Sequence, residues 1–292
     1  GFIVGPRLNA AGRLDDMSIG IECLLAESSA AARGFAEKLH QLNRERRDIE
    51  QSMQEDALTQ LQTLELETTT LPFAMTLYDP NWHQGVIGIL ASRIRERIHR
   101  PTLVFADAGE GLLKGSGRSI TGLHLRDVLD QVATRHPGLL TKFGGHAMAA
   151  GLTLAKDDLE RFRQALEDTV ADALGHTPPE QTEESDGGLA PGDFGLPLAD
   201  ELSRGGPWGQ HFPEPLFDGQ FDVRSHRIVG EKHLKLTLDV EGVEIAGIAF
   251  NIDVEEWLAA PLRKMGALYR LDVNEYRGER SAQLVIQSFW PI

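Results

Sequence analysis

The feature that most constrains the fold is a long stretch, Phe35 to Leu71, that contains no glycine or proline. Apolar residues recur in it at spacings of three, four or seven, which places them on one side of a helix. We predict a helix over about residues 29–67, which at roughly 1.5 Å per residue is about 50 Å long. Its irregular heptad pattern favours a strut between two bodies over the alternative, a coiled-coil partner. The apolar stripe consists of Phe35, Leu39, Leu42, Ile49, Met53, Ala57, Leu61 and Leu64.

The length and the cysteine content limit the class of protein. With 292 residues, the chain has room for two or three domains of roughly 100–200 residues each. Cys23 is the only cysteine, which excludes an internal disulfide and a cysteine-based metal site and indicates a reducing cytoplasm. No apolar run approaches the roughly 18–20 residues that span a bilayer, so we expect no membrane association. No positively charged segment followed by an apolar one opens the chain, so we expect no secretion by a signal peptide. Gly1 is followed at once by a motif, so we expect the C-terminal part of a longer chain.

The net charge of −15 is unevenly distributed. Between Trp82 and Met148 there are nine Lys and Arg against five Asp and Glu, whereas between Thr153 and Ser203 there are three against thirteen. The overall charge argues against an unselective basic surface for nucleic acid. Two interpretations stay open: an ordinary solvated surface with an acidic linker, or anion binding confined to one cleft.

Two differently patterned regions follow the long helix. Over residues 72–175, short buried-strand patterns such as PFAMTLY and TLVFA alternate with amphipathic helices, which predicts an α/β domain. Residues 176–195 are rich in proline, glycine and acidic residues and form a predicted linker. Beyond Phe217, five segments alternate apolar and polar residues, which predicts a five-stranded OB-like β-barrel. Residues 1–20 are glycine-rich and are predicted to be a loop.

The most specific motif is KFGGHAMAAG, residues 142–151. Gly144 and Gly145 let backbone N–H groups approach a ligand, and a short helix predicted after them would point its free N–H groups at an anion. His146 at the mouth of that helix would donate to a phosphate oxygen or transfer a proton. The alternative is a turn that needs two glycines, with His146 as a capping residue.

Two further clusters lie in the same basic region. In GSGRS, Ser116 and Arg118 offer hydroxyl and guanidinium donors that suit a phosphodiester; the alternative is a β-bulge with an exposed arginine. In NWHQGVIG, His83 and two glycines open a helix that could hold an anion, with Trp82 available to stack on a base. The alternative places Trp82 in the core and makes His83 a helix cap.

Other chemistry finds little support in the residues. No clustered set of Asp and His has the spacing of metal ligands, and no Gly-x-Ser-x-Gly elbow is present. The residues alone therefore indicate phosphate binding without the groups that cleave phosphodiesters. Trp208, Phe212 and Phe217 precede or open the predicted barrel, where core packing is favoured over stacking on single-stranded bases.

The motifs together resemble one family over essentially the whole chain. GPRLNAAGRLDDM, HQGVIGILASRI, LKGSGRSI, FGGHAMAAG, GPWGQHFPEPLF and FNIDVEEW are similar to the C-terminal two-thirds of the RecJ exonucleases of the DHH phosphoesterase superfamily. The glycine–histidine loop marks only the DHH-associated domain. The long helix, the first motif and the appended barrel are specific to RecJ. One departure is that the loop reads Phe-Gly-Gly-His where many members have a third glycine.

The resemblance implies an activity and a domain organisation. RecJ-like enzymes degrade single-stranded DNA from the 5′ end in recombination and repair, with Mg²⁺ or Mn²⁺ bound by the DHH domain. Those metal ligands would precede Gly1, so no catalytic or metal-binding residue is expected in this chain, which alone should be inactive. The implied organisation is the end of the DHH domain (1–20), a connecting helix region (21–71), the DHH-associated α/β domain (72–175), a linker (176–195) and an OB-like barrel (196–292).

The resemblance also implies site residues and partners. Single-stranded DNA is the expected partner, and a single-stranded-DNA-binding protein and a helicase are further candidates; a monomer is expected. Two other functions stay open: a non-catalytic module that binds single-stranded nucleic acid or protein, and a phosphodiesterase for short oligonucleotides, which would need no barrel. The expected substrate-binding residues are Arg7, Asn9, Arg13, His83, Ser116, Arg118, Gly144, Gly145 and His146.

Overall fold

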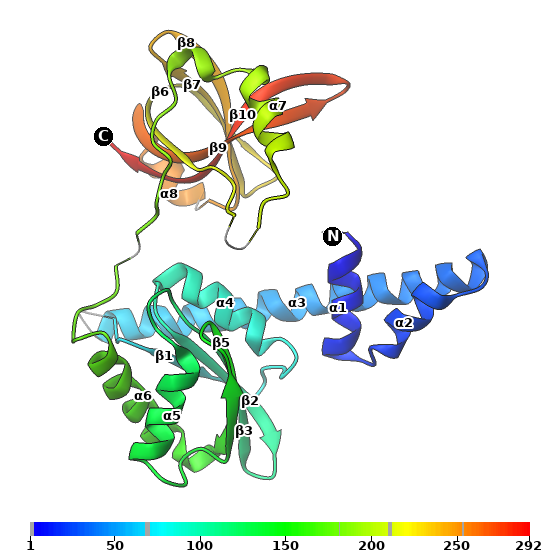
Figure 1. Ribbon diagram of the computed structural model, residues 1–292, viewed down its shortest axis with the longest axis vertical. Helices are drawn as coiled ribbons and strands as arrows, with labels where there is room; N and C mark the ends of the chain where they lie inside the picture. The colour runs from blue at the N-terminus through cyan, green and yellow to red at the C-terminus, as the bar shows by residue number, and fades with distance from the viewer. Residues whose placement is uncertain (1–2, 68–70, 181, 210–211, 253) are drawn as a thin grey trace. The chain divides into compact units, whose positions relative to one another are not determined.

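The computed structural model of the protein describes residues 3–67, 71–180, 182–209, 212–252 and 254–292. The chain forms two compact units, Gly1–Gln181 and Thr182–Ile292, which are described separately (Figure 1). Among the described residues, no helix combines the length and the apolar character needed to cross a membrane.

The first unit opens with helices where a loop was predicted. Helices α1 (Val4–Leu14) and α2 (Ser18–Leu25) pack on the first half of α3 (Ser29–Glu67). The prediction of a loop over residues 1–20 is therefore wrong. Pro6 is tolerated because it stands in the first turn of α1, where the N–H that it lacks has no helical partner.

Tertiary packing explains why this glycine-containing segment is helical. The buried Ala10 and Ala11 of α1 and Ile19 of α2 form one apolar cluster with Leu39 and Leu42 of α3. Burial of this face offsets the roughly 1 kcal/mol that a glycine loses in a helix relative to alanine. The pattern of residues 1–20 alone does not predict these helices, because their apolar face packs on α3, which lies outside that segment.

The long helix is confirmed with the predicted limits, residues 29–67. Its first half carries α1 and α2, and its second half packs Met53, Ala57 and Leu61 against the α/β domain (Figure 1). The helix therefore joins two bodies, as a strut does. Leu64 of the predicted stripe lies outside the residues whose side chains are described.

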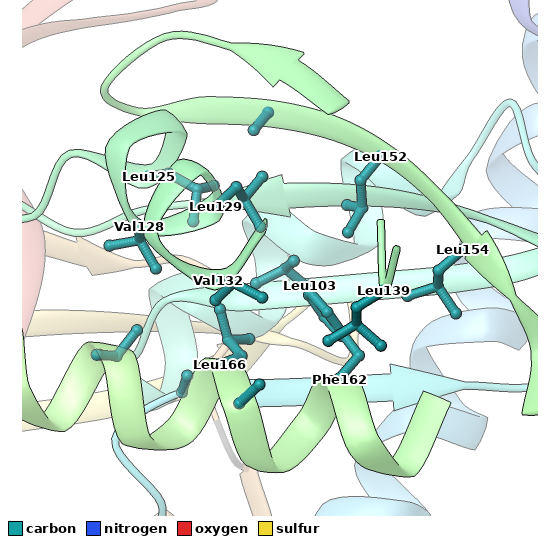
Figure 2. Packing of buried hydrophobic residues seen from close by; sticks show 14 of the residues in the cluster. Leu103, Leu125, Val128, Leu129, Val132, Leu139, Leu152, Leu154, Phe162 and Leu166 are labelled. Atoms are coloured by element: carbon teal, nitrogen blue, oxygen red, sulfur yellow. The ribbon is translucent and has the colours of Figure 1, made fainter. Parts of the chain in front are cut away.

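The α/β domain is a five-stranded sheet with the order β1-β2-β3-β5-β4. Strands β1 and β2 are parallel, and the other neighbours are antiparallel. Helix α4 packs on β2 and β3, whereas α5 and α6 cover the opposite face (Figure 1). Figure 2 shows this second core, in which leucines and valines of α5 meet Leu103, Leu152 and Leu154 of the sheet and Phe162 of α6. The elements are β1 (Met75–Tyr78), α4 (Ile87–Ile98), β2 (Thr102–Gly109), β3 (Leu112–Arg118), α5 (Leu125–Arg135), β4 (Lys142–Gly145), β5 (Ala149–Ala155) and α6 (Leu159–Ala173).

The short helix predicted after Gly145 is absent, because β4 and β5 form a hairpin there. The His146 N–H donates to the Ala149 carbonyl at 2.8 Å, which closes the turn. Outside the hairpin, the carbonyl groups of Ala147 and Met148 accept from Leu125 and Ser119. These bonds hold the alanine-rich segment in a sheet although alanine alone favours a helix.

The second unit confirms the predicted barrel. Its five strands close in the order β10-β8-β7-β6-β9, and only β8 and β10 pair in parallel. The barrel encloses one apolar core, which includes Leu236, Tyr269 and Leu284. Of the predicted linker 176–195, Leu189 and Phe194 pack on that core. The elements are α7 (Leu196–Gly205), β6 (Phe217–Val229), β7 (His233–Val240), β8 (Val243–Ala249), α8 (Val254–Ala259), β9 (Lys264–Tyr276) and β10 (Glu279–Pro291).

The three aromatic residues at the start of the barrel region have different roles. Phe217 packs on the barrel core, as predicted. The side chain of Phe212 is 56% exposed, and its ring centroid lies 4.8 Å from that of the half-buried Trp208. Core packing therefore holds for Phe217 but is wrong for Phe212, which an isolated bridge pairs with Gly209 at the surface.

Candidate functional site

One face of the α/β sheet is exposed at β5 and β4. The strand register places Ser116 of β3 opposite Gly151 of β5, which is opposite Gly144 of β4. Residues directly opposite each other in neighbouring strands point to the same face. Helix α4 covers this face over β2 and β3, and Gly144 and Gly151 are exposed beyond it.

Two exposed glycines form the floor of a shallow cavity on this face, which we call the glycine groove. A Cβ built on Gly144 meets nothing within 4 Å, and one built on Gly151 comes only within 3.9 Å of the Gly115 carbonyl oxygen. The two glycines are thus not required by packing; their lack of a side chain keeps the groove open. The groove has a volume of about 310 Å³ and is lined by Lys114, Gly115, Lys142, Phe143, Gly144, Gly151, Leu152 and Thr153.

Arg118 lies at the end of β3 and is held by two hydroxyl groups. Its Nε donates to Ser92 Oγ at 3.1 Å, and its Nη1 donates to Ser116 Oγ at 3.2 Å and to the Gly117 carbonyl at 2.8 Å. Gly88 of α4 lies directly above, since a Cβ there would come within 3.0 Å of both Arg118 Nη2 and Ser116 Oγ. The predicted alternative, a β-bulge with an exposed arginine, is wrong: the ladder from Leu112 to Arg118 against β5 is regular and Arg118 is half-buried.

The electrostatic surroundings of Arg118 are positive. The hydrogen-bond partners of this half-buried guanidinium among the described residues are two serine hydroxyls and one carbonyl, with no carboxylate. Burial lowers the pKa of Arg118, and the nearby charges of Arg13 and Arg95 lower it further. An arginine stays charged under these conditions, so the site has an unpaired positive charge that favours an anion.

A second cavity of about 530 Å³ lies beside the first and contains the predicted residues Arg13 and His83. Arg13 Nη1 donates to the Gly85 carbonyl at 2.9 Å, and the His83 Nδ1 accepts the Gly85 N–H at 3.0 Å. A Cβ on Gly85 would come within 2.1 Å of the Arg13 carbonyl oxygen, so only glycine allows α1 to lie this close. We call this cavity the α1 groove; it is lined by Gly12, Arg13, Asn81, Trp82, His83, Gln84, Gly85, Asp107 and Lys114.

Several predicted site residues are brought onto this surface. Ser116 and Gly144 lie in one row across the strands, and Arg118 lies in the next row opposite Ala149. His146 is exposed, and its N–H donates to the carbonyl of the same Ala149, on the side of β5 away from β3. His146 therefore continues the row of Arg118 and Ala149. Arg118 and His146 thus lie at the two ends of one row, although His146 is in a hairpin turn and no helix begins there.

Other predicted residues have different surroundings. Gly145 has a φ of +150°, and a Cβ there would come within 2.3 Å of the Ala149 carbonyl oxygen, so its lack of a side chain serves the hairpin itself. Arg7 donates to His40 Nδ1 at 3.2 Å and to the Ile3 carbonyl, in the contact between α1 and α3. Asn9 is exposed on α1, one turn before Arg13, and lines neither groove. Trp82 is 4% exposed in the core, which excludes stacking on a base.

Sequence reasoning missed Lys114, Lys142 and Ser92. A signal for the first of these exists: Lys114, Ser116 and Arg118 alternate with glycines, and alternate residues of a strand share one face. Ser92 lies one helical turn after Gly88, on the side of α4 that faces Arg118. Lys142 can be placed only once the hairpin pairing of β4 with β5 is known.

A metal centre does not fit the described residues. Within the ranges that the structure describes, no three His, Cys, Asp or Glu side chains are grouped so that they could hold a metal ion. The Mg²⁺ or Mn²⁺ implied by the resemblance therefore has no donor set there, and no chemical step is derived through a metal. The arrangement of Arg118, the serines and the exposed glycines can hold phosphate groups.

Comparison with known families assigns the two folded parts of the chain. The model of the DHHA1 domain matches residues 71–172, and the model of the RecJ OB domain matches residues 185–288. The chain is thus an α/β domain of the DHH-associated class followed by an OB domain of the RecJ type, as the sheet and the closed barrel require.

Individual relatives agree over the whole chain. It is 53% identical to the single-stranded-DNA-specific exonuclease RecJ of Dickeya dadantii and 50% identical to that of Escherichia coli, covering 100% of this chain and 51% of each relative. The crystal structure of RecJ in complex with Mn²⁺ from Thermus thermophilus matches with a TM-score of 0.80 and 28% identity, covering 100% of this chain and 41% of the other. The chain belongs to the RecJ family, and it spans about half the length of the curated relatives it matches.

Proposed function

We propose that this chain is the substrate-holding part of a single-stranded-DNA-specific exonuclease that degrades DNA in the 5′→3′ direction during recombination and repair. Its curated relatives are named single-stranded-DNA-specific exonucleases, and solved relatives contain Mn²⁺ or Mg²⁺. The phosphodiester is hydrolysed with such a metal ion, which is held by a part of the protein outside the described residues. The chain alone binds the strand and does not cleave it.

The observation that carries this proposal is the unpaired guanidinium of Arg118. A half-buried arginine without a carboxylate partner is costly for the fold unless an anion binds to it. The hydroxyl groups of Ser92 and Ser116 accept hydrogen bonds from the Arg118 guanidinium and fix the orientation of its plane. The guanidinium is therefore oriented before a ligand binds. A phosphate oxygen is the anion that a DNA strand offers at such a site.

The glycine groove provides the path for the strand. Gly144 and Gly151 leave the sheet surface bare, so a sugar–phosphate backbone can lie against main-chain atoms. Arg118 and His146 lie at opposite ends of the row beside these glycines. In this role His146 donates to the strand, while Arg13 and His83 border the substrate from the α1 groove.

The barrel holds the strand away from the point of cleavage. Its match to the RecJ OB domain supports this role, and the exposed Phe212, lying against Trp208, offers a ring on which a base can stack. The interaction with a single-stranded-DNA-binding protein or a helicase, the monomeric state and the cytoplasmic location stay predictions from the resemblance.

The binding of a 5′-phosphorylated single-stranded oligonucleotide tests the proposal. Fluorescence anisotropy of the 292-residue chain in EDTA should show salt-dependent binding, and Arg118→Ala should lower the affinity at least tenfold. Arg126→Ala removes an exposed arginine of α5 on the other side of the sheet and serves as the matched control. Equal affinities of Arg118→Ala and the wild type would contradict the proposal.

Activity separates this function from its two alternatives. With Mg²⁺ or Mn²⁺ added, the chain alone should release no nucleotides, whereas the protein that includes its metal-binding part should degrade single-stranded DNA. If that longer protein binds DNA and never cleaves it, the chain belongs to a binding module. If it cleaves dinucleotides as fast as long strands, it is a short-oligonucleotide phosphodiesterase.

A further inference from the structure

The lysines of the first unit fall into two classes. Lys38 forms an ion pair with Asp15 at 3.3 Å, and Lys156 forms one with Asp107 at 3.4 Å. Lys114 and Lys142 are exposed and form neither an ion pair nor a side-chain hydrogen bond with any described residue. Both of these unpaired lysines line the glycine groove.

The strand register places the two lysines on either side of Thr153. Lys114 of β3 and Lys142 of β4 are both opposite Thr153 of β5, so the three side chains point to the same face. The backbones of the two lysines are two strand spacings apart, which is roughly 10 Å. At this separation, the two long side chains can place their ammonium groups on either side of one bound anion. The hydroxyl group of Thr153 lies at the centre of this row as a third donor.

No acidic side chain of the described residues pairs with either lysine of this row. The residues that line the glycine groove include no aspartate or glutamate. Lys114 also lines the α1 groove, whose one carboxylate is Asp107. That carboxylate is already bonded to Lys156 and accepts the Tyr78 hydroxyl at 3.2 Å. Two like charges placed this way repel each other unless an anion lies between them.

The row is separate from the Arg118 site. Lys114 and Arg118 are four residues apart on β3, which corresponds to about 13 Å along the strand. One phosphate group cannot bridge that distance. The two sites would therefore hold different phosphates of one strand that crosses the glycine floor between them.

We propose that Lys114, Thr153 and Lys142 form a second phosphate-binding subsite, which takes an internal phosphate of the single strand held at Arg118. This proposal rests on the proposed function. It gives the α/β domain a preference for strands long enough to reach both sites. A mononucleotide fills only the Arg118 site, and longer strands gain the second contact, so the domain itself contributes to discrimination against very short substrates.

A length series of 5′-phosphorylated oligo(dT), from one nucleotide to eight, tests the subsite in EDTA by competition with a labelled strand. The wild-type affinity should rise in a step once the oligonucleotide reaches both sites. Lys114→Gln/Lys142→Gln should lose at least fivefold in affinity for the longer strands and less than twofold for the mononucleotide. The salt dependence of its log affinity should weaken by about 0.7 for the one phosphate contact removed.

The control removes the same charge elsewhere in the first unit. Lys38→Gln/Arg126→Gln lowers the net charge by the same amount at residues that line neither groove, and it should keep both the step and the salt dependence. If the step and the salt dependence persist in Lys114→Gln/Lys142→Gln while Arg118→Ala weakens binding, the subsite is refuted and the proposed function stands. If no oligonucleotide binds, or Arg118→Ala has no effect, the proposed function fails and the subsite fails with it.

Discussion

Gly144 and Gly151 lie opposite each other on neighbouring strands, and neither has a neighbour that would prevent it from carrying a side chain. Glycine weakens a strand, because it packs nothing and loses more backbone entropy than other residues. Two such residues side by side on an open sheet face therefore have a stability cost without a packing reason. The proposed function gives the reason: a strand of DNA needs the space.

The first prediction concerns Gly151→Val. A valine fits the extended backbone and meets only the Gly115 carbonyl near its Cβ, so the free energy of unfolding should change by less than about 1 kcal/mol. The new side chain fills the glycine groove, and the affinity for a single-stranded oligonucleotide should fall at least tenfold. Chemical denaturation and anisotropy of the same preparation provide the two measurements. Unchanged binding by a stable Gly151→Val variant would show that the strand does not use this face.

Gly145→Ala should have the opposite outcome, although the residue is next to Gly144. Its φ of +150° is unfavourable for any residue with a Cβ, and that Cβ would come within 2.3 Å of the Ala149 carbonyl oxygen. We expect the first unit to lose about 2 kcal/mol of stability or more. Thermal unfolding monitored by circular dichroism measures this loss. A variant as stable as the wild type would mean that the β4–β5 turn differs from the one described.

Gly85→Ala tests the contact between α1 and the α/β domain. The added Cβ would come within 2.1 Å of the Arg13 carbonyl oxygen, so the end of α1 has to move away. Amide hydrogen exchange measured by mass spectrometry should increase in α1, while the core helices α5 and α6 keep their protection. The control is Gly144→Ala, because a Cβ at Gly144 meets nothing within 4 Å. Equal exchange of α1 in both variants would contradict the close approach of Arg13.

The barrel should lose stability at high pH through Tyr269. Burial raises the pKa of Tyr269 to about 12, from an unfolded-state value near 10. Because the folded pKa is the higher one, its contribution to stability is complete below pH 10 and is lost as the pH rises towards about 12. Denaturation at pH values across this window should show the decline, and Tyr269→Phe should reduce its slope. The same slope in the variant would assign the decline to other groups.

Much of the fold follows from local patterns in the sequence. The helical spacing of the apolar residues predicted α3, and the alternation of apolar and polar residues beyond Phe217 predicted the five strands of the barrel. Helix α1 was not predicted because its buried residues, Ala10 and Ala11, are small and give no clear apolar pattern. Their burial depends on the contact with α3, which local patterns do not show. The β4–β5 hairpin was missed because a short alanine-rich segment after glycines satisfies helix propensity as well as strand pairing.

The candidate site was predictable to the extent that its residues are close in sequence. Ser116 and Arg118 share a strand, so the motif that contains them places both on one face. Arg7 and Arg13 belong to one sequence motif, yet side chains six residues apart on a helix point to different sides, and Arg7 contacts His40 instead. Lys142 depends on a strand register that local patterns do not contain.

The most direct test of the account maps the bound strand onto the chain by NMR. The amide signals of the isotope-labelled chain are recorded with and without a 5′-phosphorylated single-stranded oligonucleotide in EDTA, together with the Nε–H signals of the arginines. The account predicts that the amides of Gly144 and Gly151 and the Arg118 Nε–H shift together as the oligonucleotide is added. Shifts confined to the barrel or to α5 and α6, with none on the β3-β5-β4 face, would contradict it.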